Sequence, residues 1–181
     1  MKVAFAEDHI CFLHYDFRGA TVHPFGMVTP ARIRDADWTA IRPEIRTTLG
    51  ETLFIPHRFQ SALERFCGRH DIVRVARPDT WADLLEPFLD TRFGADDERA
   101  CLDRLSKAGF SPEEVTGIRQ RLGPLMYAYN FDAMVWEWIH LGLFDVLNAA
   151  NAPVVKSSLQ IALGDPAAFY NWTMKIAEQH R

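Results

Sequence analysis

The sequence lacks several features that would place it in a special class of protein. Its three cysteines are an odd number and form no C-x-x-C pair, which argues against both a disulfide framework and a thiolate zinc site. Its most apolar segment, 131–150, is interrupted by Asp132, Glu137, His140 and Asp145, which would bar it from crossing a bilayer. We therefore expect a cytoplasmic protein with no membrane partner.

Lysine is scarce as well. Only four of the 20 basic residues are lysines, so the other 16 are arginines, a skew that we attribute to a GC-rich bacterial genome. The 24 acidic residues give a formal net charge of −4, and the basic residues form no block that could hold a phosphate backbone. We therefore expect no nucleic-acid partner.

What is present is the composition of a folded protein. Apolar residues make up 48% and charged residues 24% of the 181 residues, close to the averages of globular proteins. A chain of this length suits one hydrophobic core. We therefore expect a single domain over residues 1–181.

The first thirty residues predict strands. Residues 3–6, 10–17 and 20–25 are short runs rich in aromatic and β-branched residues, separated by turn-forming residues. This pattern predicts a three-stranded antiparallel meander within 1–30. Residues 72–76 alternate in the same way and are a candidate for one more strand.

Residues 31–181 have helical periodicity instead. The candidate helices are 37–49, 56–68, 79–89, 95–108, 111–122, 131–149 and a last one from 165. The clearest start is Ser111, because its hydroxyl can accept from first-turn amides while Glu114 reaches back to it. The sequence therefore predicts an α+β fold, predominantly α-helical, with the N-terminal meander packed on a bundle of about six helices.

Three polar side chains gather on one face of the predicted meander. If 18–19 is a two-residue loop, facing positions sum to 37, and His14, Asp16 and His23 share that face. The opposite face, directed at the core, then holds Cys11, Leu13, Tyr15, Phe17 and Val22. A three-residue loop, which the turn 16–19 also permits, would move His23 to the other face. We favour the first register because it buries a whole apolar face.

Two imidazoles and one carboxylate are the ligand types of a catalytic zinc or a redox iron. His14, Asp16 and His23 are therefore candidate metal ligands. The simpler interpretation is an exposed polar face with two ordinary histidines and no cofactor. We favour that simpler interpretation.

A second polar group falls on the predicted helix 131–149. Glu137 and His140 have the spacing that supplies two ligands to one ion in carboxylate-bridged helix bundles, although the chain has no second pair of this kind. Tyr127 and Tyr129 come just before this helix and could line the same pocket. These four residues are candidates for a pocket.

The sequence contains no complete catalytic motif, such as a phosphate-binding loop or a nucleophile elbow. Aromatic residues, at 12%, and arginines are common, and both are favoured at protein interfaces. We therefore expect a non-enzymatic protein–protein interaction or regulatory module, whose partner is a protein, a second copy of the chain included. The alternative is a small metal-dependent enzyme that uses His14, Asp16 and His23, or Glu137 with His140.

Overall fold

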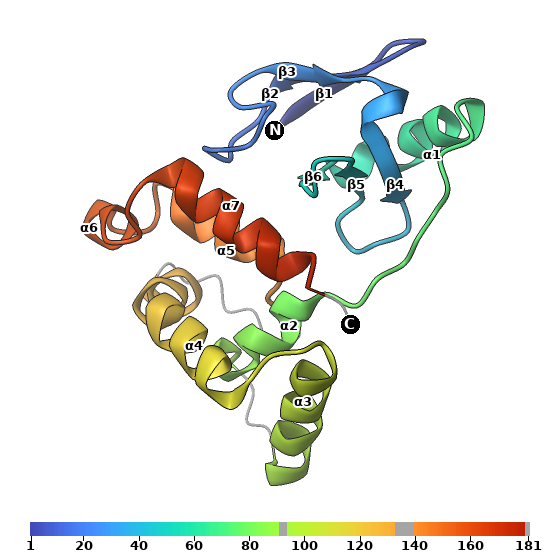
Figure 1. Cartoon of the computed structure of the whole chain (residues 1–181). Coiled ribbons are helices and arrows are strands. Elements are labelled where there is room, and N and C mark those ends of the chain that lie inside the picture. Colours follow the sequence, from blue (N-terminus) through green and yellow to red (C-terminus); the bar gives the residue numbers. More distant parts are fainter. Residues whose placement is uncertain (91–93, 133–139, 180–181) are drawn as a thin grey trace. The chain divides into compact units, whose positions relative to one another are not determined.

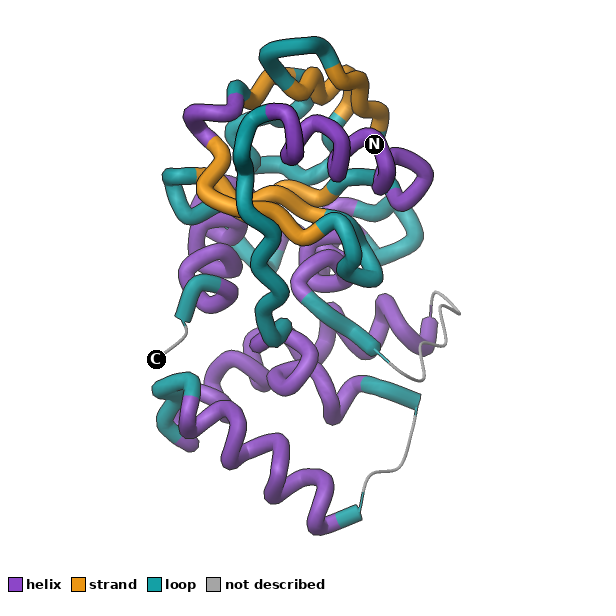
Figure 2. Tube along the Cα trace, turned by 90° about the vertical axis from the view of Figure 1, so that its right-hand side faces the viewer, coloured by secondary structure: helices purple, strands orange, loops and turns teal. Residues whose placement is uncertain are grey.

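The computed structural model describes residues 1–90, 94–132 and 140–179, which divide into two compact units, 1–78 and 79–181 (Figure 1). All the described strands belong to the first unit, and most of the helices belong to the second (Figure 2). Compact units of this kind occur within one domain as well as between domains. The single domain expected from the sequence therefore stays a prediction.

The first sheet is antiparallel, with the order β1-β2-β3. Its strands are β1 (Lys2–Phe5), β2 (Ile10–His14) and β3 (Gly26–Val28). Cys11 faces Ala4 of β1 on one side and Met27 of β3 on the other. The first two strands confirm the sequence pattern. The third is wrong, because residues 20–25 form turns and bends and the strand begins only at Gly26.

A second antiparallel sheet, with the order β4-β5-β6, follows in the chain. A 3-10 turn, η1 (Pro30–Arg32), leads into β4 (Ile33–Asp37), β5 (Glu44–Thr47) and β6 (Thr52–Phe54). These strands replace the predicted helix 37–49. A helix over 37–49 would place Ile41 and Leu49 on its apolar side. They are instead 74% and 66% exposed, so no helix buries them. The expected strand at 72–76 is reduced to one parallel bridge, between Arg74 and Ala36 of β4.

Because of the second sheet, the observed architecture differs from the predicted one. The α+β class holds, with about half of the described residues helical. The single N-terminal meander followed by helices is wrong, because two three-stranded sheets come first and the helices of the second unit follow. The physical reason is that β4 carries buried carboxylates, which a sequence pattern assigns to solvent.

Aromatic side chains form the core of the first unit. A short 3-10 turn, η2 (His57–Phe59), precedes helix α1 (Gln60–Arg69). Phe66 of this helix packs against Phe5 of β1 with ring centroids 5.9 Å apart. Tyr15 is fully buried between Phe12 and Phe17, and its hydroxyl accepts a 3.0 Å hydrogen bond from the Phe54 amide. The loop after β2 therefore joins the two sheets of this unit.

The second unit is helical. Its elements are α2 (Thr80–Leu85), the 3-10 turn η3 (Glu86–Phe88), α3 (Ala95–Lys107), α4 (Pro112–Tyr127), the π-helical turn η4 (Ala128–Asp132), α5 (Leu143–Asn151), α6 (Ser157–Ile161) and α7 (Pro166–Ala177). The predicted cap at Ser111 is confirmed, with its hydroxyl 3.2 Å from the Glu114 amide. The predicted start of the last helix at residue 165 is confirmed, and the Asp165 carboxylate caps it by accepting from the Ala168 amide at 2.7 Å.

Two predicted helix ends are wrong. α4 does not break at Gly123-Pro124, because the buried residues Leu122, Leu125 and Met126 hold it on the core past the proline. The predicted helix 131–149 does not begin at residue 131. α5 begins directly after Gly142, whose backbone is extended, and residues 133–139 lie outside the described residues.

Trp81 of α2 is the largest fully buried side chain in the described part of the second unit. Its indole Nε1 donates a 3.1 Å hydrogen bond to the Thr173 carbonyl of α7. Its ring lies 5.8 Å from that of Trp172, and the Arg121 guanidinium of α4 lies 4.2 Å from the Trp172 ring. One aromatic cluster therefore holds α2, α4 and α7 together.

Candidate functional site

The structure brings together two of the three candidate metal ligands. His14 ends β2, and its Nε2 lies 2.8 Å from the Asp16 carboxylate, with both side chains about half exposed. His23 instead places its Nδ1 2.8 Å from the Tyr15 carbonyl oxygen. The favoured register is wrong, because β2 and β3 pair with facing positions that sum to 38. In the described part of the chain, no three His, Cys, Asp or Glu side chains form a group that could hold a metal ion.

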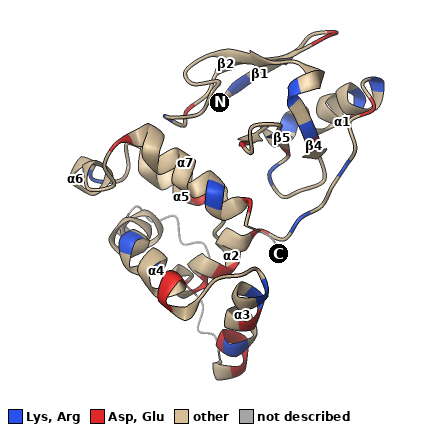
Figure 3. Ribbon diagram, viewed as in Figure 1, with Lys and Arg blue, Asp and Glu red and all other residues tan. Residues whose placement is uncertain are grey.

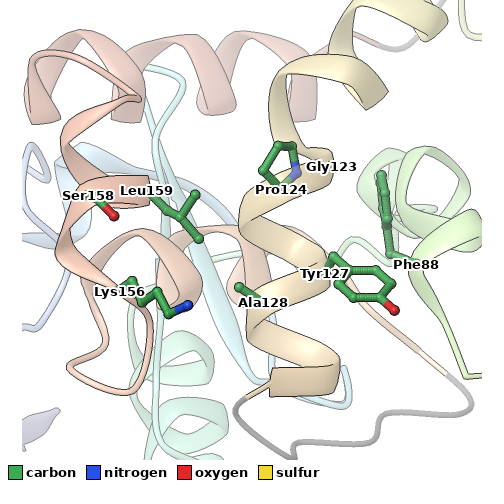
Figure 4. A pocket seen from close by; sticks show the side chains of 8 residues that line it. All are labelled: Phe88, Gly123, Pro124, Tyr127, Ala128, Lys156, Ser158 and Leu159. Carbon is green, nitrogen blue, oxygen red and sulfur yellow. The ribbon is translucent and has the colours of Figure 1, made fainter.

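Three of the four candidate pocket residues, Tyr127, Tyr129 and His140, are described, and they make different contacts. Tyr127 is exposed at the end of α4 and lines a pocket (Figure 4). Tyr129 is buried, and its hydroxyl lies 3.2 Å from the Asp145 carboxylate and 3.0 Å from the Asn148 amide. His140 lies beside Asp79, with 3.6 Å between Nε2 and Oδ2. Glu137 lies outside the described residues.

Asp79 and His140 enclose the glycine at the start of α5. Asp79 caps α2 through the Trp81 amide at 3.0 Å, and its other oxygen accepts from the Leu143 amide at 3.3 Å. A Cβ at Gly142 would lie 2.1 Å from the Asp79 carboxylate and 2.8 Å from the His140 ring. A side chain at position 142 would displace the Asp79 carboxylate or the His140 ring, so glycine lets the two helix starts form this joint.

The buried charges of the second sheet form a network. Asp35 accepts hydrogen bonds from Arg46, from Arg34 at 3.0 Å and from Arg77 at 3.1 Å. Arg46 also donates to Glu44 at 2.6 Å. Burial alone would raise the pKa of Asp35, but the hydrogen bonds from Arg46 and Arg34 outweigh it and hold the pKa below its usual value of 3.8. The network joins β4 to β5 and is fully paired, so its evident role is structural.

Two cysteines are unsuited to nucleophilic chemistry. Burial raises the pKa of Cys67 and of Cys101 to about 12, so both remain protonated thiols near neutral pH. Cys101 donates to the Asp83 carbonyl at 3.1 Å and packs inside the second unit. Neither thiol is placed to attack a substrate.

The outer face of the first sheet is the most distinctive exposed surface of the first unit. Ala4, Cys11 and Met27 form one cross-strand row, and Leu13 continues it along β2. Phe25, directly before β3, adds an exposed ring at the end of this sheet. Leu13 is 61%, Met27 58% and Phe25 75% exposed. We call these five residues the apolar face.

Charges of both signs lie at the two ends of the apolar face. Lys2 is exposed at the first residue of β1, and Glu7 and Asp8 are exposed in the turn that follows the strand. The Ala6 amide closes this turn on the His9 carbonyl at 3.0 Å. The edge strand β1 therefore carries a cation at its start and carboxylates just beyond its end.

The sequence pattern did not find the apolar face, because it placed Leu13 and Cys11 in the core. In β2 the buried residues are Ile10 and Phe12, while Tyr15 and Phe17 become buried only after the strand ends. Within 10–17 the buried positions are therefore even-numbered before His14 and odd-numbered after it. The signal that could have found this is the excess of apolar residues in 10–17, which is more than one face of a strand can bury.

Comparisons of this chain with protein-family models, with curated proteins and with solved structures give no match. Among the described helices, none is long and apolar enough to cross a membrane.

Proposed function

We propose that this chain is a non-enzymatic module that acts by binding protein, and that the apolar face of the first sheet is its contact surface. The observation that carries the proposal is the exposure of Leu13, Phe25 and Met27 together on one small sheet. Contiguous exposed apolar surface is unfavourable in water and often marks a protein interface. Phenylalanine and methionine are also enriched at such interfaces.

The partner that suits this face is a second copy of the chain. A two-fold axis that sets two β1 strands antiparallel would place Lys2 of one copy opposite Glu7 and Asp8 of the other. The same axis would bring the two apolar faces together. Opposite charges at the two ends of the strand would then fix the register of the pair.

Protein is a better partner than nucleic acid for this chain. Each unit carries both signs of charge (Figure 3), and the formal net charge is −4. The proposal includes a cytoplasmic location, which the three free cysteines, Cys11, Cys67 and Cys101, support because thiols persist in a reducing compartment. The proposal also includes a bacterial source, which the excess of arginine over lysine supports.

Sedimentation velocity of the full chain over a concentration series tests the proposal. We expect the wild-type chain to dimerise, and Leu13→Lys and Met27→Lys to remain monomeric at concentrations where the wild type is dimeric. The matched control is Ile161→Lys, because Ile161 is 75% exposed but lies on α6, away from the apolar face. A wild-type chain that stays monomeric throughout, or equal loss of dimer in the control, would overturn the proposal.

A further inference from the structure

A pocket of about 490 Å³ opens in the second unit (Figure 4). Its wall comes from three segments that are distant in the sequence, namely η3, the C-terminal half of α4 and the start of α6. This volume falls within the range of small-molecule sites, about 300–1,000 Å³. The chemistry of the wall therefore decides what kind of ligand would fit.

Most of the wall is apolar. Pro124 lines it from α4, Ala128 from the first residue of η4, Leu159 from α6 and the Phe88 ring from η3. Gly123 lies next to that ring, since a Cβ at this position would lie 3.7 Å from it. Side chains of this kind suit a flat ring or a branched aliphatic group, which they can contact on several sides.

The polar groups of the wall are one cation and two hydroxyls. Figure 4 shows the Lys156 side chain extending toward α4, with Ser158 two residues further along the chain. The Tyr127 side chain is 59% exposed, so its hydroxyl is accessible. Among the side chains that the structure describes, no carboxylate is ion-paired with Lys156. The ammonium group is therefore available to an anionic ligand.

We infer that this pocket binds a small organic anion, in which a carboxylate is attached to an aromatic or branched aliphatic body. The carboxylate would accept hydrogen bonds from Lys156 and Ser158, and the body would pack on Pro124, Leu159 and Phe88. The inference goes beyond protein binding and does not depend on it, because every residue of the pocket belongs to the second unit.

Two probes of equal shape separate the contribution of charge from that of apolar contact. In titrations of the ¹⁵N-labelled full chain, followed by NMR, 1-naphthoate carries the anion and 1-naphthamide replaces it with a neutral amide. We expect both probes to shift the amides of α4 and α6. The affinity for naphthoate should be about 1.5- to fivefold higher, the effect of one exposed ion pair.

The variant Lys156→Met keeps the aliphatic stem and removes the charge, so it should bind the two probes equally. Its matched control is Lys175→Met, because Lys175 is exposed on α7 and is not part of the pocket wall. That control should keep the preference for naphthoate. Absence of binding by both probes, or a preference for naphthoate that survives in Lys156→Met, would overturn the inference.

Discussion

The two units of this chain hold their buried polar groups in different ways. In the first unit the buried charged residues are Asp35, Asp37, Arg46 and Glu51, and Asp35 and Arg46 form an ion pair between β4 and β5. In the described part of the second unit the buried charged residue is Asp145, which accepts from the Gly142 amide at the start of α5. The first unit therefore depends on paired charges, and the second on side chains that satisfy helix ends.

This difference follows from the elements themselves. Strands of three to five residues bury little apolar area, so charged groups that lie between them must be paired in full. Helix ends expose amides that one carboxylate or hydroxyl can satisfy, at about 1 kcal/mol for each cap. Loss of one partner should therefore cost more in the first unit than loss of one cap costs in the second.

The largest expected effect is that of Arg46→Met, which leaves the buried Asp35 carboxylate without its main partner. We expect the free energy of unfolding to fall by about 3–5 kcal/mol. Chemical denaturation followed by circular dichroism measures it. The double variant Asp35→Leu with Arg46→Met should recover part of the loss, because no single buried charge is then left unpaired. A loss below about 1 kcal/mol for the single variant would show that the network is not important for stability.

A smaller effect is expected at the joint of the second unit. Gly142→Ala places a methyl group against the Asp79 carboxylate and should cost about 1–3 kcal/mol. Gly117→Ala is the control, because Gly117 is exposed within α4 and a Cβ there meets nothing within 4 Å. That control should gain about 0.5–1 kcal/mol. Equal thermal stability of the two variants would argue against a close contact at Gly142.

The network of the first unit should also respond to acid. The folded pKa of Asp35 lies below its unfolded value, so its contribution to stability is complete above the unfolded value of about 4 and is lost as the pH falls through the folded value. Denaturation curves at pH values from 6 downward give the free energy of unfolding at each pH. That free energy should fall less steeply with decreasing pH for Asp35→Asn than for the wild type. Asp96→Asn is the control, because Asp96 is 95% exposed. An unchanged slope in Asp35→Asn would contradict the assignment.

The smallest effects distinguish His14 from His23 in the first unit. His14→Ala removes an exposed pair with Asp16 and should change the free energy of unfolding by no more than about 0.5 kcal/mol. His23→Ala removes a contact with the Tyr15 carbonyl and should cost about 1 kcal/mol. Denaturation curves with and without zinc measure both. Stabilisation of the wild type by zinc that both variants abolish would restore the metal site.

The second unit was the more predictable of the two because its signals are local. The structure confirms the cap of Ser111 with Glu114, which lies at the helix start that it marks. Asp165 with Pro166 lies in the same way at the start of α7, and Gly109 lies just after the end of α3. The positive φ of Gly109, 92°, is a conformation that glycine adopts readily. A signal contained in four residues can be recognised without knowledge of the rest of the fold.

The second sheet was missed because its determinants are distant from one another. Asp35 is buried on account of arginines 11 and 42 residues further along the chain, and no local pattern reports that pairing. Trp38, Ile41, Ile45 and Leu49 happened to match a helical period. Pro43, directly before β5, was the one local sign against a helix. The apolar face was missed for a related reason, since an apolar residue in a strand is assigned to the core unless the register is known.

The cluster of Trp81, Trp172 and Arg121 has a spectroscopic consequence. Four of the five tryptophans lie in the second unit, and Trp38 is the one tryptophan of the first. Indole emission will therefore report mainly the second unit, and the first, with seven of the 13 phenylalanines, will contribute little light. A Trp38→Phe chain would make that emission specific to the second unit, so that unfolding of this unit can be followed by itself in an intact molecule.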